Sequence, residues 1–165
     1  MEQISKVITV EEHFMSEKVN GEYQKLLEKK NLTLAQKAKA NFIQQFVAKG
    51  EITEVGEKRL EFMETHGIDC QILSYGNNSP SYLDPKQAVV LCQMANEELA
   101  GYCKQYPGNF YGFAVLPVGD TGAALTELER AVKTLGLKGI IFNGAYQESY
   151  FDEDRFSQLL KWLRS

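Results

Sequence analysis

Near the N-terminus, an apolar run leads directly into three ionisable residues. Residues 7–10 are Val-Ile-Thr-Val, and Glu11, Glu12 and His13 follow at once. Because successive side chains of a strand point to opposite faces, Glu11 and His13 are expected on one side and Glu12 on the other. A carboxylate and an imidazole that converge in this way can supply two ligands to a divalent metal such as zinc. The alternative is a solvent-exposed strand end with a hydrogen-bonded histidine.

The position of these residues favours the metal site. Residues 7–10 are apolar and β-branched almost without a break, as expected of a strand buried on both faces. A carboxylate at the end of such a strand is costly to desolvate unless it is paired or coordinated. This position strengthens the hypothesis that Glu11 and His13 are metal ligands, and the solvent-exposed strand end stays the alternative.

The second histidine and the three cysteines fit structural roles better than chemical ones. His66 precedes a glycine at a predicted helix end, where an interaction with the helix dipole explains it. The cysteines have no Cys-x-x-Cys spacing, and we interpret them as small buried hydrophobic residues in a reducing compartment: Cys70, Cys92 and Cys103.

Four further residues are candidates for site or packing roles. Asn143 follows a predicted strand and either contacts substrate or makes a turn with the next glycine. We keep it as a candidate substrate-binding residue. Phe14 and Tyr75 are expected to pack in the core, and Arg59 to be a solvated helix residue or an ion-pair partner.

Strands and helices alternate along the chain and would position these residues. The pattern predicts strands at 7–10, 70–75, 110–116 and 140–142, each followed by a helix with an apolar stripe. A lysine- and glutamine-rich region at 17–49 is interpreted as a helical insertion after the first strand, a pair of short helices joined near Asn31. Such alternation argues for adjacent parallel strands joined by right-handed crossovers.

Two architectures fit this alternation: an open doubly wound sheet, or part of a closed (β/α)₈ barrel. No Gly-x-Gly-x-x-Gly or Walker motif follows a strand, which weakens the nucleotide-binding forms of the open sheet. Polar residues gather instead at the C-terminal strand ends, where barrel enzymes keep their sites. A whole barrel takes about 250 residues, so four units correspond to half of one.

Composition places the chain among globular proteins. Its 165 residues are 44% hydrophobic and 24% charged, with a net charge of -4. No basic run suggests nucleic acid, and no apolar stretch approaches the roughly 18 residues of a membrane span. The N-terminus has an acid where a secretory signal has bases. We expect a single cytoplasmic domain over residues 1–165, with neither nucleic acid nor a membrane as partner.

Several segments, in order, resemble the amidohydrolase-2 family, which includes aminocarboxymuconate semialdehyde decarboxylase and the resorcylate (dihydroxybenzoate) decarboxylases. The opening run Val-Ile-Thr-Val-Glu-Glu-His-Phe resembles the family's first strand, and its Glu-x-His form is similar to the resorcylate decarboxylase branch. The likeness continues through RLEFMETHGIDCQILSYGNNSP, ANEELAGYCKQYPGNFYGFAVLPVGD and LGLKGIIFNG. The insertion at 17–49 is matched least.

The resemblance implies a distorted (β/α)₈ barrel with one divalent metal, usually zinc and sometimes manganese. Its first-strand ligands fall on Glu11 and His13. The family's further ligands, a histidine on the fifth strand and an aspartate on the eighth, would both lie beyond Ser165. The implied reaction is hydrolysis, or non-oxidative decarboxylation of an aromatic or unsaturated carboxylic acid. No residue of this chain is identified as the catalytic proton-transfer group.

The leading hypothesis is therefore the N-terminal half of a metal-dependent hydrolase or carboxy-lyase that binds a small carboxylic acid. Alone, the chain is expected to hold its metal weakly or not at all, and to be inactive. The alternatives are a non-catalytic half-barrel binding or assembly module and an independent open α/β domain. Because a half barrel leaves two sheet edges open, we also expect a homo-oligomer.

Overall fold

The computed structural model of the protein describes the larger part of the chain. The described residues are 6–29, 33–34, 37–38, 41–42, 45, 50, 52–76, 79–142, 145–146 and 149–163. Asn143 lies outside them, as does most of the second helix expected within 17–49. None of the described helices is long and apolar enough to cross a membrane.

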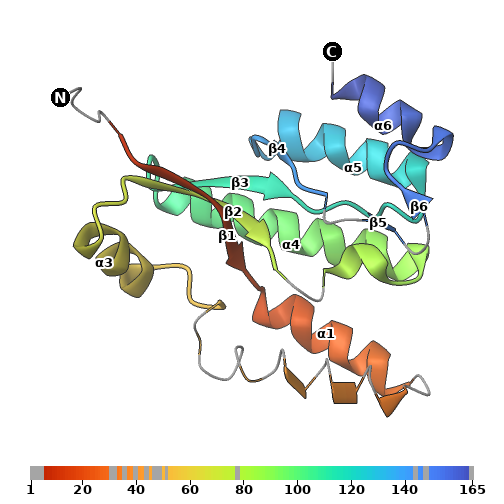
Figure 1. Ribbon diagram of the computed structural model, residues 1–165, viewed down its shortest axis with the longest axis horizontal. Coiled ribbons are helices and arrows are strands. Elements are labelled where there is room, and N and C mark those ends of the chain that lie inside the picture. The colour runs from red at the N-terminus through yellow and green to blue at the C-terminus, as the bar shows by residue number, and fades with distance from the viewer. Residues whose placement is uncertain are drawn as a thin grey trace.

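Four parallel strands form the central sheet (Figure 1). They are β1 (Ile8–Phe14), β2 (Cys70–Tyr75), β3 (Phe110–Ala114) and β4 (Gly139–Ile140). Each strand pairs with the next in the order β1-β2-β3-β4, and every pairing is parallel. The predicted adjacency and direction of the strands are confirmed.

Helices connect or follow these strands, among them α1 (Glu17–Glu28), α3 (Glu57–Thr65), α4 (Pro85–Gln105), α5 (Thr121–Lys133) and α6 (Ser157–Trp162). Side chains cap the start of two of these helices, since Asp84 accepts a hydrogen bond from the Lys86 amide and Asp120 from the Ala123 amide. Short 3-10 helices occupy Pro80–Tyr82 and Asp154–Phe156. A small antiparallel hairpin of β5 (Ala145–Tyr146) and β6 (Ser149–Tyr150) was not predicted.

The apolar core lies between the sheet and the helices. Leu73, Phe110 and Ala114 are buried on the sheet side of this core, and Leu99 of α4 is buried on the helix side. Gly112 permits the close approach, because a Cβ atom there would lie 2.7 Å from Leu99 Cδ2. The helices therefore cover one face of the sheet directly.

The opposite face of the sheet is open. Ile8 and Val10 of β1 are 51% and 58% exposed, and Tyr111 and Phe113 are half-buried while their neighbours along β3 are buried. The prediction that the first strand is buried on both faces is wrong, because no second layer of the described chain covers this face. Leu73, Ala114 and Leu116 are buried and do not contribute to the open face.

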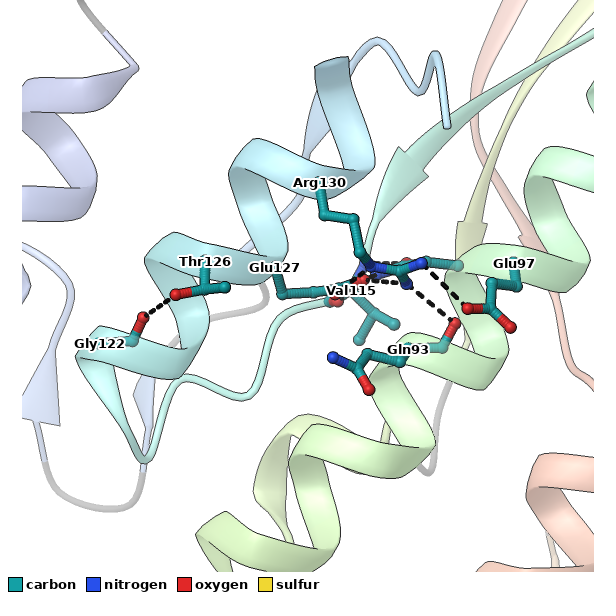
Figure 2. A network of polar contacts seen from close by, with 8 residues as sticks. Gln93, Glu97, Val115, Gly122, Thr126, Glu127 and Arg130 are labelled. Atoms are coloured by element: carbon teal, nitrogen blue, oxygen red, sulfur yellow. Dashed lines mark hydrogen bonds and ion pairs between the residues drawn. The ribbon is translucent and has the colours of Figure 1, made fainter. Parts of the chain in front are cut away.

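A buried polar network fixes the end of β3 to two helices (Figure 2). The amide side chain of Asn96 on α4 bonds both backbone groups of Val115: its Nδ2 donates to the carbonyl (2.9 Å), and its Oδ1 accepts from the amide (2.9 Å). Asn96 Nδ2 also donates to Glu127 of α5 at 2.7 Å. Glu127 in turn accepts from Arg130, which reaches Glu97 on α4. The network thus holds the chain where it leaves the sheet.

Candidate metal centre

The first strand contains a β-bulge at the residues that the sequence singles out. Thr9 lies opposite Gln71 and Glu12 opposite Leu73, so Val10 and Glu11 together face one residue, Ile72. Glu11 has a φ of 60°, in the left-handed region that favours glycine. For a residue with a side chain this backbone costs about 1–2 kcal/mol. Bulges with such strain are frequent beside functional sites, where they redirect a side chain.

The bulge changes which face His13 occupies. In parallel strands, residues in register point to the same face. Thr9 and Glu12 therefore share the helix-covered face with Gln71 and Leu73, and His13 shares the open face with its partner Ser74. Unbroken alternation from Thr9 would have placed His13 on the helix-covered face. His13 thus reaches the open face because of the bulge, and not through the simple alternation that the sequence analysis assumed.

The imidazole and backbone of His13 are held from separate directions. Its Nδ1 lies 3.2 Å from the hydroxyl of Ser74, which is fully buried. Its carbonyl accepts a hydrogen bond from Arg59 Nη2 at 2.9 Å. Gly76 leaves the room that His13 needs, since a Cβ there would lie 3.3 Å from the His13 Cβ. The ring nitrogen Nε2 makes none of these contacts.

Arg59 has a role that the sequence analysis missed. Its guanidinium is hydrogen-bonded to the Glu54 carbonyl (3.4 Å) and to Gln71 Oε1 (3.4 Å), besides His13. Burial lowers its pKa, and the charges of Glu12 and Glu54 oppose that shift. A signal was present, because Arg59 is four residues before the buried Met63 and so lies on the same face of α3.

A cleft of about 1130 Å³ lies beside this strand end, on the helix-covered side. Residues of β1, α1, α3 and α4 line it, among them Glu12, Arg59, Phe62, Glu98 and Tyr102. His13 also lines this cleft, whereas Glu11 is not among its lining residues. The cleft therefore reaches one of the two candidate ligands.

The side chains of Glu11 and His13 are both exposed. A carboxylate and an imidazole suit zinc and also manganese, so these donors fit part of a metal's ligand shell. Within the described residues, no group of three or more His, Cys, Asp or Glu side chains could hold a metal ion. The two residues thus offer half of an ordinary four-ligand site.

The other candidates have structural roles. His66 follows α3, with its Nδ1 2.8 Å from the Phe62 carbonyl and its ring stacked on Phe62. Cys70 and Cys92 are buried and Cys103 is half-buried, all as free thiols. Burial raises the pKa of the Cys103 thiol to about 11, which disfavours a reactive thiolate. Phe14 and Tyr75 pack edge to face in the core, as predicted.

Sequence comparison identifies relatives of the chain. The family model described as amidohydrolase matches residues 40–165, most of the chain. A gamma-resorcylate decarboxylase from Rhizobium radiobacter is 39% identical over 100 residues, which cover 59% of this chain and 30% of that protein.

Two solved structures are similar over nearly the whole chain. One is a 5-carboxyvanillate decarboxylase from Novosphingobium aromaticivorans, complexed with manganese and 4-hydroxy-3-methoxy-5-nitrobenzoic acid. Its TM-score is 0.85 at 27% identity, over 98% of this chain and 48% of that one. The other is a dihydroxybenzoic acid decarboxylase from Polaromonas with bound manganese and the inhibitor 2-nitroresorcinol. Its TM-score is 0.75 at 26% identity, over 96% of this chain and 46% of that one.

These similarities confirm the predicted fold, a partial (β/α) barrel made of parallel strand–helix units. The chain spans less than half the length of each of the three proteins. The family model covers three of the four strands and the helices that follow them. The chain belongs to the amidohydrolase family.

Proposed function

We propose that the chain forms the metal-binding half of a barrel carboxy-lyase that acts on an aromatic or unsaturated carboxylic acid. The observation that carries the proposal is the bulge in β1, which holds Glu11 in a left-handed conformation and turns His13 to the open face. The relatives add the substrate class, since the names of all three describe decarboxylases of aromatic acids. Hydrolysis is the other reaction of such barrels, but none of these three proteins is named as a hydrolase.

Glu11 and His13 are the proposed ligands of a divalent metal. Zinc suits a Glu and His donor set, and manganese is the metal named for both similar structures. When bound, the metal would act as a Lewis acid that polarises a substrate oxygen. Nδ1–H of His13 would donate to Ser74 and thereby leave the lone pair of Nε2 for the metal. Asn143, after the fourth strand, stays a proposed substrate contact.

The remaining contribution of this chain is to orient the substrate and to shield it from water. The apolar side chains of the open face, such as Val10 and Phe113, offer an apolar surface next to the ligands. None of the described residues there is identified as a proton donor. We expect that group, and the further ligands, from barrel elements that these four strands do not form.

Metal titration tests the proposal. The purified chain is dialysed against Zn²⁺ and, separately, Mn²⁺, and the bound metal is measured for the wild type, His13→Ala, Glu11→Gln and His66→Ala. We expect weak binding in the wild type and in His66→Ala, since two protein ligands are fewer than a zinc site normally uses. We expect a loss of at least tenfold in affinity for the other two variants. Equal binding by all four chains would reject the metal site.

A non-catalytic half-barrel module is the second candidate. The observation in its favour is that the described residues hold no group of three or more metal-binding side chains. The same titration separates the two functions, because such a module would bind neither metal at Glu11 and His13.

A further inference from the structure

Arg59 joins three segments of the chain behind the proposed ligands. Its guanidinium donates to the backbone of β1 at His13, to the side chain of Gln71 on β2, and to the carbonyl of Glu54 ahead of α3. Its shortest contact, 2.9 Å, is the one to His13. The guanidinium lies on the helix-covered side of β1, whereas the His13 ring lies on the open side.

The acceptors of Arg59 are unusual for a partly buried cation. Among the described residues, no carboxylate lies within 4.0 Å of its nitrogens, although Glu12 and Glu54 act on it over longer distances. A cation withdrawn from water is costly unless hydrogen bonds compensate it. A planar guanidinium can reach several acceptors in different directions at once, which a lysine ammonium on its flexible stem does less well.

The hydrogen bond from Arg59 to the His13 carbonyl lies next to the bulge, where the pairing of β1 with β2 is interrupted. A bulge interrupts the strand ladder, and a left-handed residue persists only where its surroundings fix the backbone. His13 is two residues after Glu11, and its carbonyl is the first backbone group beyond the bulge that a side chain of α3 binds. The orientation of both proposed ligands depends on this short segment of backbone.

We propose that Arg59 is a positioning residue, which fixes the backbone of β1 at His13 and thereby holds Glu11 and His13 in the geometry that binds the metal. This inference rests on the proposed function, because the geometry that Arg59 maintains matters only if Glu11 and His13 bind a metal. It predicts that Arg59 acts on the ligands through the backbone of β1, by its hydrogen bond to the His13 carbonyl.

The first test measures the backbone in the metal-free chain. Amide hydrogen exchange is compared between the wild type, Arg59→Met, Arg59→Lys and the control Lys58→Met, whose parent residue is exposed on the same helix. We expect exchange at Glu12, His13 and Phe14 to accelerate about tenfold in Arg59→Met, partly in Arg59→Lys and not in the control. The amides of β3 serve as an internal reference that corrects for any loss of global stability.

The second test measures metal affinity in the same four chains, together with His13→Ala. We expect about a tenfold weaker affinity in Arg59→Met, the size usual for residues that support a ligand, with partial recovery in Arg59→Lys. Unchanged exchange in β1 would overturn the inference whether or not metal binds. Faster exchange with unaltered affinity would overturn it as well, by making Arg59 merely structural. If wild type and His13→Ala bind metal equally, the proposed function fails, and the positioning of ligands by Arg59 fails with it.

Discussion

Glu11 combines a strained backbone with a proposed chemical role. Nothing in local preference favours a glutamate at a φ of 60°, a conformation suited to glycine. Strain of this kind persists in proteins mostly where function requires it. A glycine would suit the backbone better but would remove the carboxylate, so stability and metal binding are expected to oppose each other at this position.

This opposition can be measured with two matched substitutions. Glu11→Gly should raise the free energy of unfolding by about 0.5–1 kcal/mol, because relief of the left-handed strain exceeds the entropy cost of glycine. Glu12→Gly removes the same charge at a residue whose φ is not positive, and should lower the free energy of unfolding by about 0.5–1 kcal/mol. Urea unfolding measures both. Destabilisation of Glu11→Gly to the same extent as Glu12→Gly would show that position 11 is not strained.

The sequence identified the candidate ligands but not how the fold presents them. Glu11 and His13 stand out because they belong to a run of three ionisable residues that follows an apolar strand. The bulge is invisible at that level, since it depends on the register between β1 and β2, which are 56 residues apart at Phe14 and Cys70. Arg59 was within reach of sequence analysis through its helical spacing to Met63. We missed it because a charged residue on a helix usually faces water.

At the scale of elements, strong local sequence signals were sufficient to predict the bounds of some strands and helices. The second strand was predicted at 70–75, the bounds that it has, and α4 begins directly after its cap Asp84. The weakest predictions lie near the C-terminus. The fourth strand was expected at 140–142 but is Gly139–Ile140, and the last helix is divided into a 3-10 turn and the short α6. Strand length depends on pairing with neighbours, which a single segment does not encode.

The network around Glu127 explains how α4, α5 and the end of β3 keep their arrangement. Glu127 is 1% exposed and has both its oxygens bonded, to Asn96 and Arg130 (Figure 2). A buried carboxylate is tolerated there because a cation and an amide compensate it. Since Asn96 also bonds both backbone groups of Val115, the network fixes the start of the loop after β3.

Glu127→Ala should lower the free energy of unfolding by about 3 kcal/mol, because it removes one acceptor of a buried amide and the buried carboxylate that a partly buried cation pairs with. Glu129→Ala is the matched control on the same helix. Glu129 pairs with Lys133 at the surface, and its loss should cost less than about 1 kcal/mol. Thermal or urea unfolding of the two variants provides the comparison. Similar losses for both would mean that the buried network adds nothing beyond an ordinary surface pair.

At the scale of the whole molecule, the most conspicuous feature is one-sided burial. Helices cover one face of the sheet, whereas the other shows Ile8 and Val10 at the surface. Among the described residues, β1 and β4 are the edge strands of the sheet, and each has one edge that no other strand pairs. Open edges and exposed apolar side chains both favour association with another chain. The same face holds the proposed ligands, so whatever covers it would also enclose the metal.

We predict that the 165-residue chain, taken alone, self-associates through this face. A two-fold dimer would set the β1 edge of one copy beside the β4 edge of the other and bury both apolar faces, as isologous interfaces do. Sedimentation velocity at tens of micromolar should therefore show a dimer or larger species. Val10→Lys should shift it towards monomer, because a buried lysine without a partner is costly.

Val90→Lys is the control for this substitution, since Val90 is similarly exposed, at 55% against 58% for Val10, but lies on α4 on the helix side of the sheet. It should leave the distribution of species unchanged. If the wild type sediments as a single monomer, the open face is stable in water without a partner. Its apolar residues would then be a surface for substrate alone, and the argument for a second half covering the ligands would lose its energetic basis.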